Sequence, residues 1–326
     1  MTSITRRSLA ALLPLPAFAQ NAGFMPDRPV TVVAPFSAGG AADLAARLFA
    51  QHAPKHMGAG APPMVVENRT GASGAVGTQY VARARPDGTT LLLARVGSSA
   101  VLPATDSRTP YTPDDFTWLG LLDENPYVVC VRADAPWNDL RALLAAMRES
   151  PGRLNFATSG PATILDLGVR QMMALAELPM DAAQALPFRG GGDALVALLG
   201  GQAQFVGNNL GDMMGAIRDG RVRALVVSTA SRLPDLPDVP TAQEAGMPRL
   251  AELAGWNAVA APANLPEAAT RYWSGVIAAL AQDEAWVSAT RRLGSVPRIL
   301  GPEETRAHVV AQIAMFRGLA QRLGLG

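Results

Sequence analysis

The sequence predicts an α/β fold of about two domains. Short apolar strands alternate with helices along most of the chain, and Gly-rich turns separate several strands from the helices that follow. This alternation is typical of a mostly parallel sheet that helices cover on both faces. The 326 residues are enough for about two domains, since a domain usually has ~150 residues. A composition of 49% hydrophobic and 17% charged residues is that of a globular protein.

The N-terminal residues, 1–19, have the parts of a secretory signal peptide. Arg6-Arg7 is a short basic stretch, residues 9–16 are mostly apolar, and Ala17-Phe18-Ala19 fits a signal peptidase site. We therefore expect export to the periplasm, by a Sec or a twin-arginine signal. The apolar stretch has about half of the ~20 residues that span a bilayer, so we expect no membrane anchor.

The net charge and the cysteine content give two further expectations. The net charge of +1 gives no reason to expect binding to nucleic acid. Cys130 is the one cysteine of the sequence and lies in an apolar stretch, so no intramolecular disulfide can form. We expect it to be a buried, unreactive thiol.

The expected elements follow from hydrophobic periodicity and turn residues. In the first part of the chain they are a strand at 29–36, a helix at 41–52, a strand at 64–67, a helix at 76–84 and a strand at 90–94. In the second part they are strands at 127–131, 154–157, 204–206 and 222–228, and helices at 140–149, 164–176, 193–199, 266–280 and 302–323.

The first strand leads into a Gly-containing loop of Phe36, Ser37, Ala38, Gly39 and Gly40. Backbone N–H groups can converge there with the positive end of the next helix, which favours an anion. The loop matches neither nucleotide-binding glycine motif. Tight packing of helix on strand is the alternative explanation.

Other strand-to-helix turns carry polar or flexible residues of the same kind. They comprise Ser98, Ser99, Thr158, Ser159, Gly160, Thr163, Arg189, Gly190 and Asn208. Ligands of open α/β sheets bind beyond the carboxyl ends of the strands, where these turns lie. Helix capping explains Ser159 and Thr163 equally well, and solvent exposure could explain Arg189 and Asn208.

Motifs of catalysis and metal binding are absent from the sequence. His52 and His56 are four residues apart, yet the adjacent Glu of H-E-x-x-H is missing. There is no G-x-S-x-G motif and no Cys/His cluster. We therefore expect a protein that is not an enzyme and holds neither a metal nor a cofactor.

Several motifs, in order, resemble the Bug solute receptors of tripartite tricarboxylate transporters. The segments are PVTVVAPFSAGGAAD at 29–43, VVENRTGASGAVG at 65–77, PDGTTLL at 86–92, PFRGGG at 187–192, LGGQ at 199–202 and LPDLPDVPT at 233–241. The resemblance covers nearly the whole chain after residue 19.

This resemblance implies a type II periplasmic binding protein, with two α/β lobes and a hinged cleft between them. Residues 20–125 plus 230–326 would form one lobe and 126–229 the other. The loop 36–40 would present amides to a carboxylate of the ligand, and the turns at 98–99, 158–163 and 189–192 would complete the pocket.

The resemblance also suggests the partners. We expect a monomer that binds a di- or tricarboxylate, an amino acid or an aromatic acid for membrane permease subunits. A sensory receptor that signals to another protein is the alternative on the same scaffold. The turn at 158–163 departs from the family pattern, because Ala162 replaces a Gly and Asp166 replaces a His. A carboxylate there could repel a dicarboxylate, pair with an amino group, or lie on the back of its helix.

Overall fold

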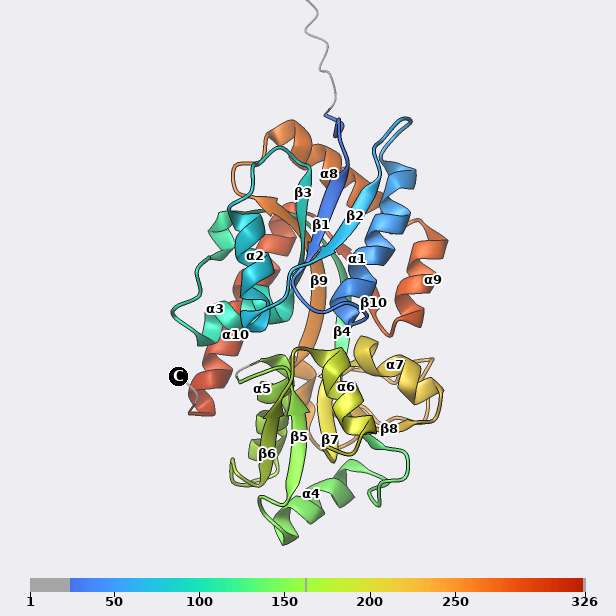
Figure 1. The fold of residues 1–326 in the computed structure, drawn as a ribbon. Helices are drawn as coiled ribbons and strands as arrows, with labels where there is room; N and C mark the ends of the chain where they lie inside the picture. The colour runs from blue at the N-terminus through green and yellow to red at the C-terminus, as the bar shows by residue number, and fades with distance from the viewer. Residues whose placement is uncertain (1–23, 162, 325–326) are drawn as a thin grey trace, which may run out of the picture.

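A computed structural model describes residues 24–161 and 163–324 (Figure 1). The expected signal peptide, residues 1–19, lies outside the described residues. The strands are β1 (Val30–Ala34), β2 (Met64–Asn68), β3 (Thr90–Arg95), β4 (Phe116–Arg132), β5 (Leu154–Thr158), β6 (Ala183–Pro187), β7 (Phe205–Asn209), β8 (Val222–Val227), β9 (Ala254–Pro262) and β10 (Val296–Leu300). The α-helices are α1 (Ala41–His52), α2 (Ala75–Ala82), α3 (Leu102–Thr105), α4 (Leu140–Glu149), α5 (Ile164–Leu175), α6 (Gly191–Leu199), α7 (Leu210–Arg218), α8 (Glu267–Leu280), α9 (Glu284–Arg292) and α10 (Pro302–Arg322).

The strands form two groups that share β4. In the group we call lobe 1, β1 pairs in parallel with β2 and β3, and β9 joins β3 to the first part of β4 by antiparallel pairing. In the group we call lobe 2, β5 pairs in parallel with β6 and β7, and β7 and β8 pair antiparallel with the second part of β4. Figure 1 shows lobe 1 above lobe 2.

Each sheet is therefore mixed, although the sequence predicts mostly parallel sheets. The expected parallel strands are present in both lobes, and the strands that connect or extend the lobes run antiparallel to their neighbours. The long strand β4 runs from lobe 1 into lobe 2, and β9 is paired with the lobe 1 part of β4 (Figure 1).

The long strand β4 changes partners at the lobe boundary. Pro126 is paired with Ala254 of β9, and the next residue, Tyr127, is paired with Asn209 of β7. This change of partner supports our proposal that 20–125 plus 230–326 belong to lobe 1 and 126–229 to lobe 2.

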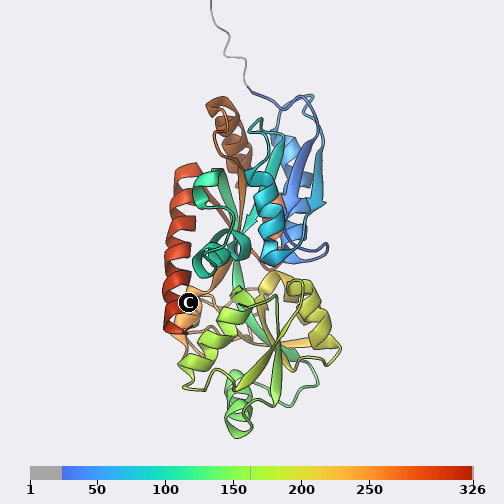
Figure 2. The same cartoon turned by 60° about the vertical axis from the view of Figure 1, so that its left-hand side comes forward.

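Lobe 1 is packed on both faces of its sheet. Val30 and Val32 of β1 are fully buried with Phe49 of α1 and the tryptophans of α8 and α9. The intervening Val33 belongs to the core on the opposite face, because successive strand residues point to opposite sides. Helix α10 runs along β4 on that face and reaches α5 of lobe 2 (Figures 1 and 2).

The core of lobe 2 surrounds the second half of β4. Tyr127 and Cys130 are buried there with Phe156 and Phe205. Burial raises the pKa of the Cys130 thiol, since the apolar surroundings disfavour a thiolate. The expectation of a buried thiol is therefore confirmed.

Candidate functional site

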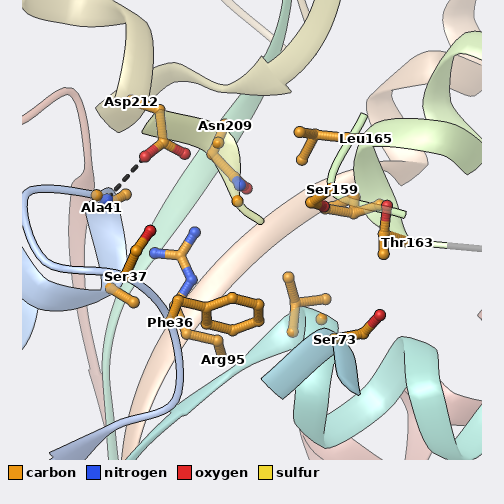
Figure 3. Close-up of a pocket in the computed structure, with 17 residues that line it drawn as sticks. Phe36, Ser37, Ala41, Ser73, Arg95, Ser159, Thr163, Leu165, Asn209 and Asp212 are labelled. Atoms are coloured by element: carbon orange, nitrogen blue, oxygen red, sulfur yellow. Dashed lines mark hydrogen bonds between the residues drawn. The ribbon is translucent and has the colours of Figure 1, made fainter. Parts of the chain in front are cut away.

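A pocket lies between the two lobes (Figure 3). Both lobes line it, mostly with residues at the carboxyl ends of strands β1, β3, β5, β6 and β7, as expected for an α/β protein. The lining residues are Phe36, Ser37, Gly40, Ala41, Ala42, Ser73, Arg95, Val96 and Gly97 of lobe 1, and Ser159, Thr163, Ile164, Leu165, Gly190, Gly191, Asn209 and Asp212 of lobe 2.

Helices α1, α5, α6 and α7 all begin at this pocket. Their N-cap residues, Gly40, Thr163, Gly190 and Asn209, line its wall, and none of them caps its helix with a side-chain hydrogen bond. The first N–H groups of a helix lack intrahelical acceptors and carry partial positive charge. The pocket is therefore built to attract an anion.

The loop between β1 and α1 contributes only part of what the sequence predicts. Phe36, Ser37 and Gly40 line the pocket, whereas Ala38 and Gly39 do not. Gly39 has φ +79°, a conformation that L side chains rarely adopt. Its N–H donates to Asp43 Oδ2 at 2.9 Å, so this amide is engaged within the loop.

The Asp43 carboxylate stabilises the conformation of that loop through hydrogen bonds. Arg47 Nε donates to its Oδ2 at 2.9 Å and Asn68 Nδ2 donates to its Oδ1 at 3.0 Å. Burial acts to raise the pKa of Asp43, but these hydrogen bonds and that of the Gly39 N–H outweigh it and hold the pKa below its usual range. Asp43 therefore acts as the first-turn acid of α1, the structural role that its position suggests.

The turn between β5 and α5 contributes Ser159 and Thr163 to the pocket. Thr158 and Gly160 do not line it. The hydroxyls of Thr158 and Thr163 both donate to the Gly160 carbonyl oxygen, at 3.0 and 2.8 Å. These bonds fix the turn, so Thr158 and Gly160 shape the site from outside its wall.

Of the remaining predicted residues, one lines the pocket and the others lie outside its lining. Gly190 lines the pocket, and the neighbouring Arg189 is exposed outside it. Asn208 is fully buried behind the wall, where its Nδ2 donates to the Gly191 carbonyl oxygen at 3.0 Å. Ser98 and Ser99 are buried next to the pocket but are not part of its lining.

Arg95 is a pocket residue that the sequence did not single out. It ends β3 and is only 5% exposed, yet its guanidinium points into the pocket (Figure 3). Its Nη1 donates to Asn257 Oδ1 at 3.1 Å and to Asn125 Oδ1 at 3.3 Å. Within the described residues, Nε and Nη2 donate no hydrogen bond. A buried guanidinium with open donors is suited to a carboxylate.

A buried polar layer on the long strands supports Arg95. Asn257 Nδ2 donates to Asp123 Oδ1 at 2.8 Å, and the Asn125 amide donates to the same oxygen. Burial raises the pKa of Asp123 to about 6, although these amides and the charge of Arg95 oppose the rise. The layer belongs to β4 and β9 of lobe 1, close to the point where β4 enters lobe 2.

Asp212 is the second charged residue among those that line the pocket, and it was also not predicted. Its Oδ1 accepts a hydrogen bond from the backbone N–H of Ala41 at 2.7 Å, which links lobe 2 to the start of α1 (Figure 3). Burial raises the pKa of Asp212, while the charge of Arg95, the Ala41 N–H and the Asn209 side chain act to lower it.

Asp166 is placed away from the pocket wall. Its carboxylate accepts from Arg170 Nε at 2.9 Å to each oxygen, and its side chain is 2% exposed. Of the alternatives left open by the sequence, the structure favours a place within the helix packing. The described residues also contain no group of three or more His, Cys, Asp or Glu that could hold a metal ion.

Two α/β lobes that share the long strand β4 and enclose a polar pocket define the class of two-lobed solute-binding proteins. Residues 45–285 match the family model described as the tripartite tricarboxylate transporter family receptor. The chain belongs to this family, as the motifs of the sequence predict. It is a family of periplasmic solute receptors rather than of enzymes.

Relatives and solved structures agree with this assignment. BugT of Bordetella pertussis (strain Tohama I) is 31% identical over 309 residues, which cover 93% of this chain and 92% of BugT. MatC from Rhodopseudomonas palustris, solved with bound malate, has a TM-score of 0.82 and 30% identity, and the match covers 90% of this chain and 99% of MatC. Rpa4515 from R. palustris, solved with adipate, has a TM-score of 0.86 and 29% identity, with 92% and 98% covered. Together they confirm the type II binding-protein fold.

Proposed function

We propose that this chain is an exported receptor that binds a small carboxylate in the pocket and delivers it to the membrane permease of a tripartite transporter. The observation that carries the proposal is the convergence of α1, α5, α6 and α7 on one pocket through N-termini whose own N-cap residues make no side-chain cap hydrogen bond. The amides at these ends favour an anion between the lobes.

Arg95 makes a carboxylate the preferred anion. The open Nε and Nη2 donors of a guanidinium match the two oxygens of a carboxylate in a fixed planar arrangement. The pocket lies between two lobes, which is a usual place for a small-molecule ligand. Malate and adipate, the acids bound by MatC and Rpa4515, belong to this size and class.

The strands at the lobe boundary supply a route for closure. A ligand that contacts Ser37 of lobe 1 and Thr163 of lobe 2 stabilises the arrangement in which both lobes touch it. We propose that β4 and β9 act as the hinge, because both strands lie at the lobe boundary.

Export and passive binding complete the proposal. Residues 1–19 would direct the chain to the periplasm, where it would act as a monomer without catalysing a reaction. Among the described residues, no helix is both long and apolar enough to cross a bilayer.

A thermal-shift screen of the exported protein tests the proposal. Mono-, di- and tricarboxylates and amino acids are compared with the matching carboxamides, which keep size but lose the carboxylate charge. A true ligand at ~100 times its Kd adds ~2.7 kcal/mol to the free energy of unfolding, which raises Tm by several degrees. The proposal fails if no acid raises Tm and the denatured protein releases no bound acid.

A further inference from the structure

The pocket contains one positive and one negative side chain among the residues that line it. Arg95 comes from lobe 1 and Asp212 from lobe 2. Each influences the other electrostatically, but no ion pair joins them within the described part of the chain. The two charges therefore face one pocket without satisfying each other.

Arg95 is fixed at its place on the floor of the pocket. Its Nη1 is held by Asn125 and Asn257, and these amides are anchored in turn on Asp123. The open Nε and Nη2 donors leave the guanidinium ready for one carboxylate. Reorienting it toward Asp212 would break this buried layer, and leaving buried polar groups without partners is costly.

Asp212 is fixed in the same way on the opposite wall. Its Oδ1 accepts from the Ala41 N–H at 2.7 Å. Oδ2 lies against the bare backbone of Gly191, where even an added Cβ would collide with it. The Asp212 carboxylate thus occupies the position at the start of α1 that an anion of the ligand could otherwise take. It also presents negative charge to the pocket.

A pocket with separated opposite charges favours a ligand with the complementary dipole. We infer that Asp212 sets the ligand class of this receptor, selecting a carboxylate that also carries an ammonium group, such as an amino acid, over the dicarboxylate of equal length. The ligand carboxylate would lie at Arg95 and the helix N-termini, and its ammonium at Asp212. A second carboxylate would instead meet the like charge of Asp212. This inference rests on the proposed function and names its substrate class.

Matched ligands test the inference. Isothermal titration of the wild-type protein compares sets of four- and five-carbon ligands: the amino acid, the acid without the amino group, and the diacid. We expect the best-bound amino acid to bind at least tenfold more tightly than the diacid of its length. Asp212→Asn keeps the shape and an oxygen acceptor for Ala41 N–H, and should reduce this ratio at least tenfold.

Asp193→Asn is the matched control, because it removes the same charge in the first turn of α6 without altering the lining of the pocket. It should leave the ratio unchanged. The inference is overturned if the wild type prefers the diacid, or if Asp212→Asn weakens all the acids equally. A protein that binds none of the acids would instead contradict the proposed function itself.

Discussion

Asp212 Oδ1 lies 2.7 Å from the backbone nitrogen of Ala41 and accepts its hydrogen bond across the boundary between the lobes. A side chain of lobe 2 thereby satisfies an amide at the first turn of a helix in lobe 1. Such amides prefer an anion. The geometry of the pocket therefore depends on the position of one carboxylate, and that position depends on its neighbours.

Gly191→Ala should displace this carboxylate. A Cβ at Gly191 would collide with Asp212 Oδ2 and would come within 2.7 Å of Asn208 Oδ1. We expect affinity for the carboxylate ligand to fall about tenfold or more while the lobes remain folded, as measured by titration and circular dichroism.

Gly192→Ala is the control for this substitution. Its Cβ would meet only the Gly40 backbone, at 3.8 Å, an ordinary contact. Affinity should therefore stay near the wild-type value. Equal loss in both variants would mean that helix α6, rather than Asp212, sets the affinity.

Asp123 should make stability depend on pH between about 4 and 6. Burial raises its pKa in the folded protein to about 6, above the ordinary 3.8. The folded protein therefore binds the Asp123 proton more tightly than the unfolded chain does. The stability that this proton contributes is complete below the ordinary pKa and is lost as the pH rises through about 6. Relative to Asp123→Asn, the wild type should lose ~3 kcal/mol of unfolding free energy over this range. Urea unfolding of both proteins at pH 4.5, 5.5 and 7 measures it, and a constant difference between them would contradict the assignment.

Local sequence predicted much of the fold and the turns that line the pocket. Helices such as Ala41–His52 and Leu140–Glu149 match their predicted bounds, because apolar periodicity and turn residues mark them. Ser37, Ser159 and Gly190 line the pocket as a result of their place after strands. The sequence did not indicate which way each side chain faces, and so it also included Ser98 and Thr158.

The missed elements are those in which tertiary contacts override local preference. Helix α7 contains Gly211 and Gly215, which disfavour a helix, but Met213 and Met214 are buried in the lobe 2 core. The first part of β4 was not predicted as a strand, because it contains Asp123 and polar neighbours, which are rare in strands.

The two charged residues of the pocket were missed for a related reason. Arg95 ends a strand with the apolar run Leu91-Leu92-Leu93, and a charge in that place is a usable signal for a strand-end site. Asp212 carries no such signal, because an acid in the first turn of a helix is common on any surface. The role of Asp212 in the pocket becomes evident only from its hydrogen bond with the Ala41 N–H, which joins the two lobes.

Asp283 should stabilise lobe 1 more than an ordinary helix cap. It caps α9 through the Trp286 N–H at 3.0 Å and also accepts from His52 Nδ1 at 3.0 Å. The His52 hydrogen bond is the main cause that lowers its pKa. A depressed pKa means that this contribution is present at neutral pH and is lost as the pH falls toward the folded-state pKa.

Asp139 offers the comparison, because it caps α4 through the Ala142 N–H at 2.8 Å on an exposed surface. Asp139→Ala should cost about 1 kcal/mol, the usual value of a cap, and Asp283→Ala should cost more at pH 7. Chemical denaturation checks both. A smaller effect at Asp283 would show that the His52 contact adds nothing.

Gly207 should be intolerant of any side chain, because β7 passes directly over the Tyr127 hydroxyl in the core of lobe 2. A Cβ at Gly207 would overlap this hydroxyl, and Val169 would lie 3.0 Å away on another side. Tyr127 is 1% exposed, so its ring is enclosed by the core. We expect Gly207→Ala to cost about 3 kcal/mol, at the upper end for overpacking a core. Gly215→Ala is the control, because its Cβ would meet nothing within 4 Å; in a helix it should raise stability by up to about 1 kcal/mol. Urea unfolding separates the two, and a wild-type midpoint for Gly207→Ala would mean that Tyr127 has another place to go.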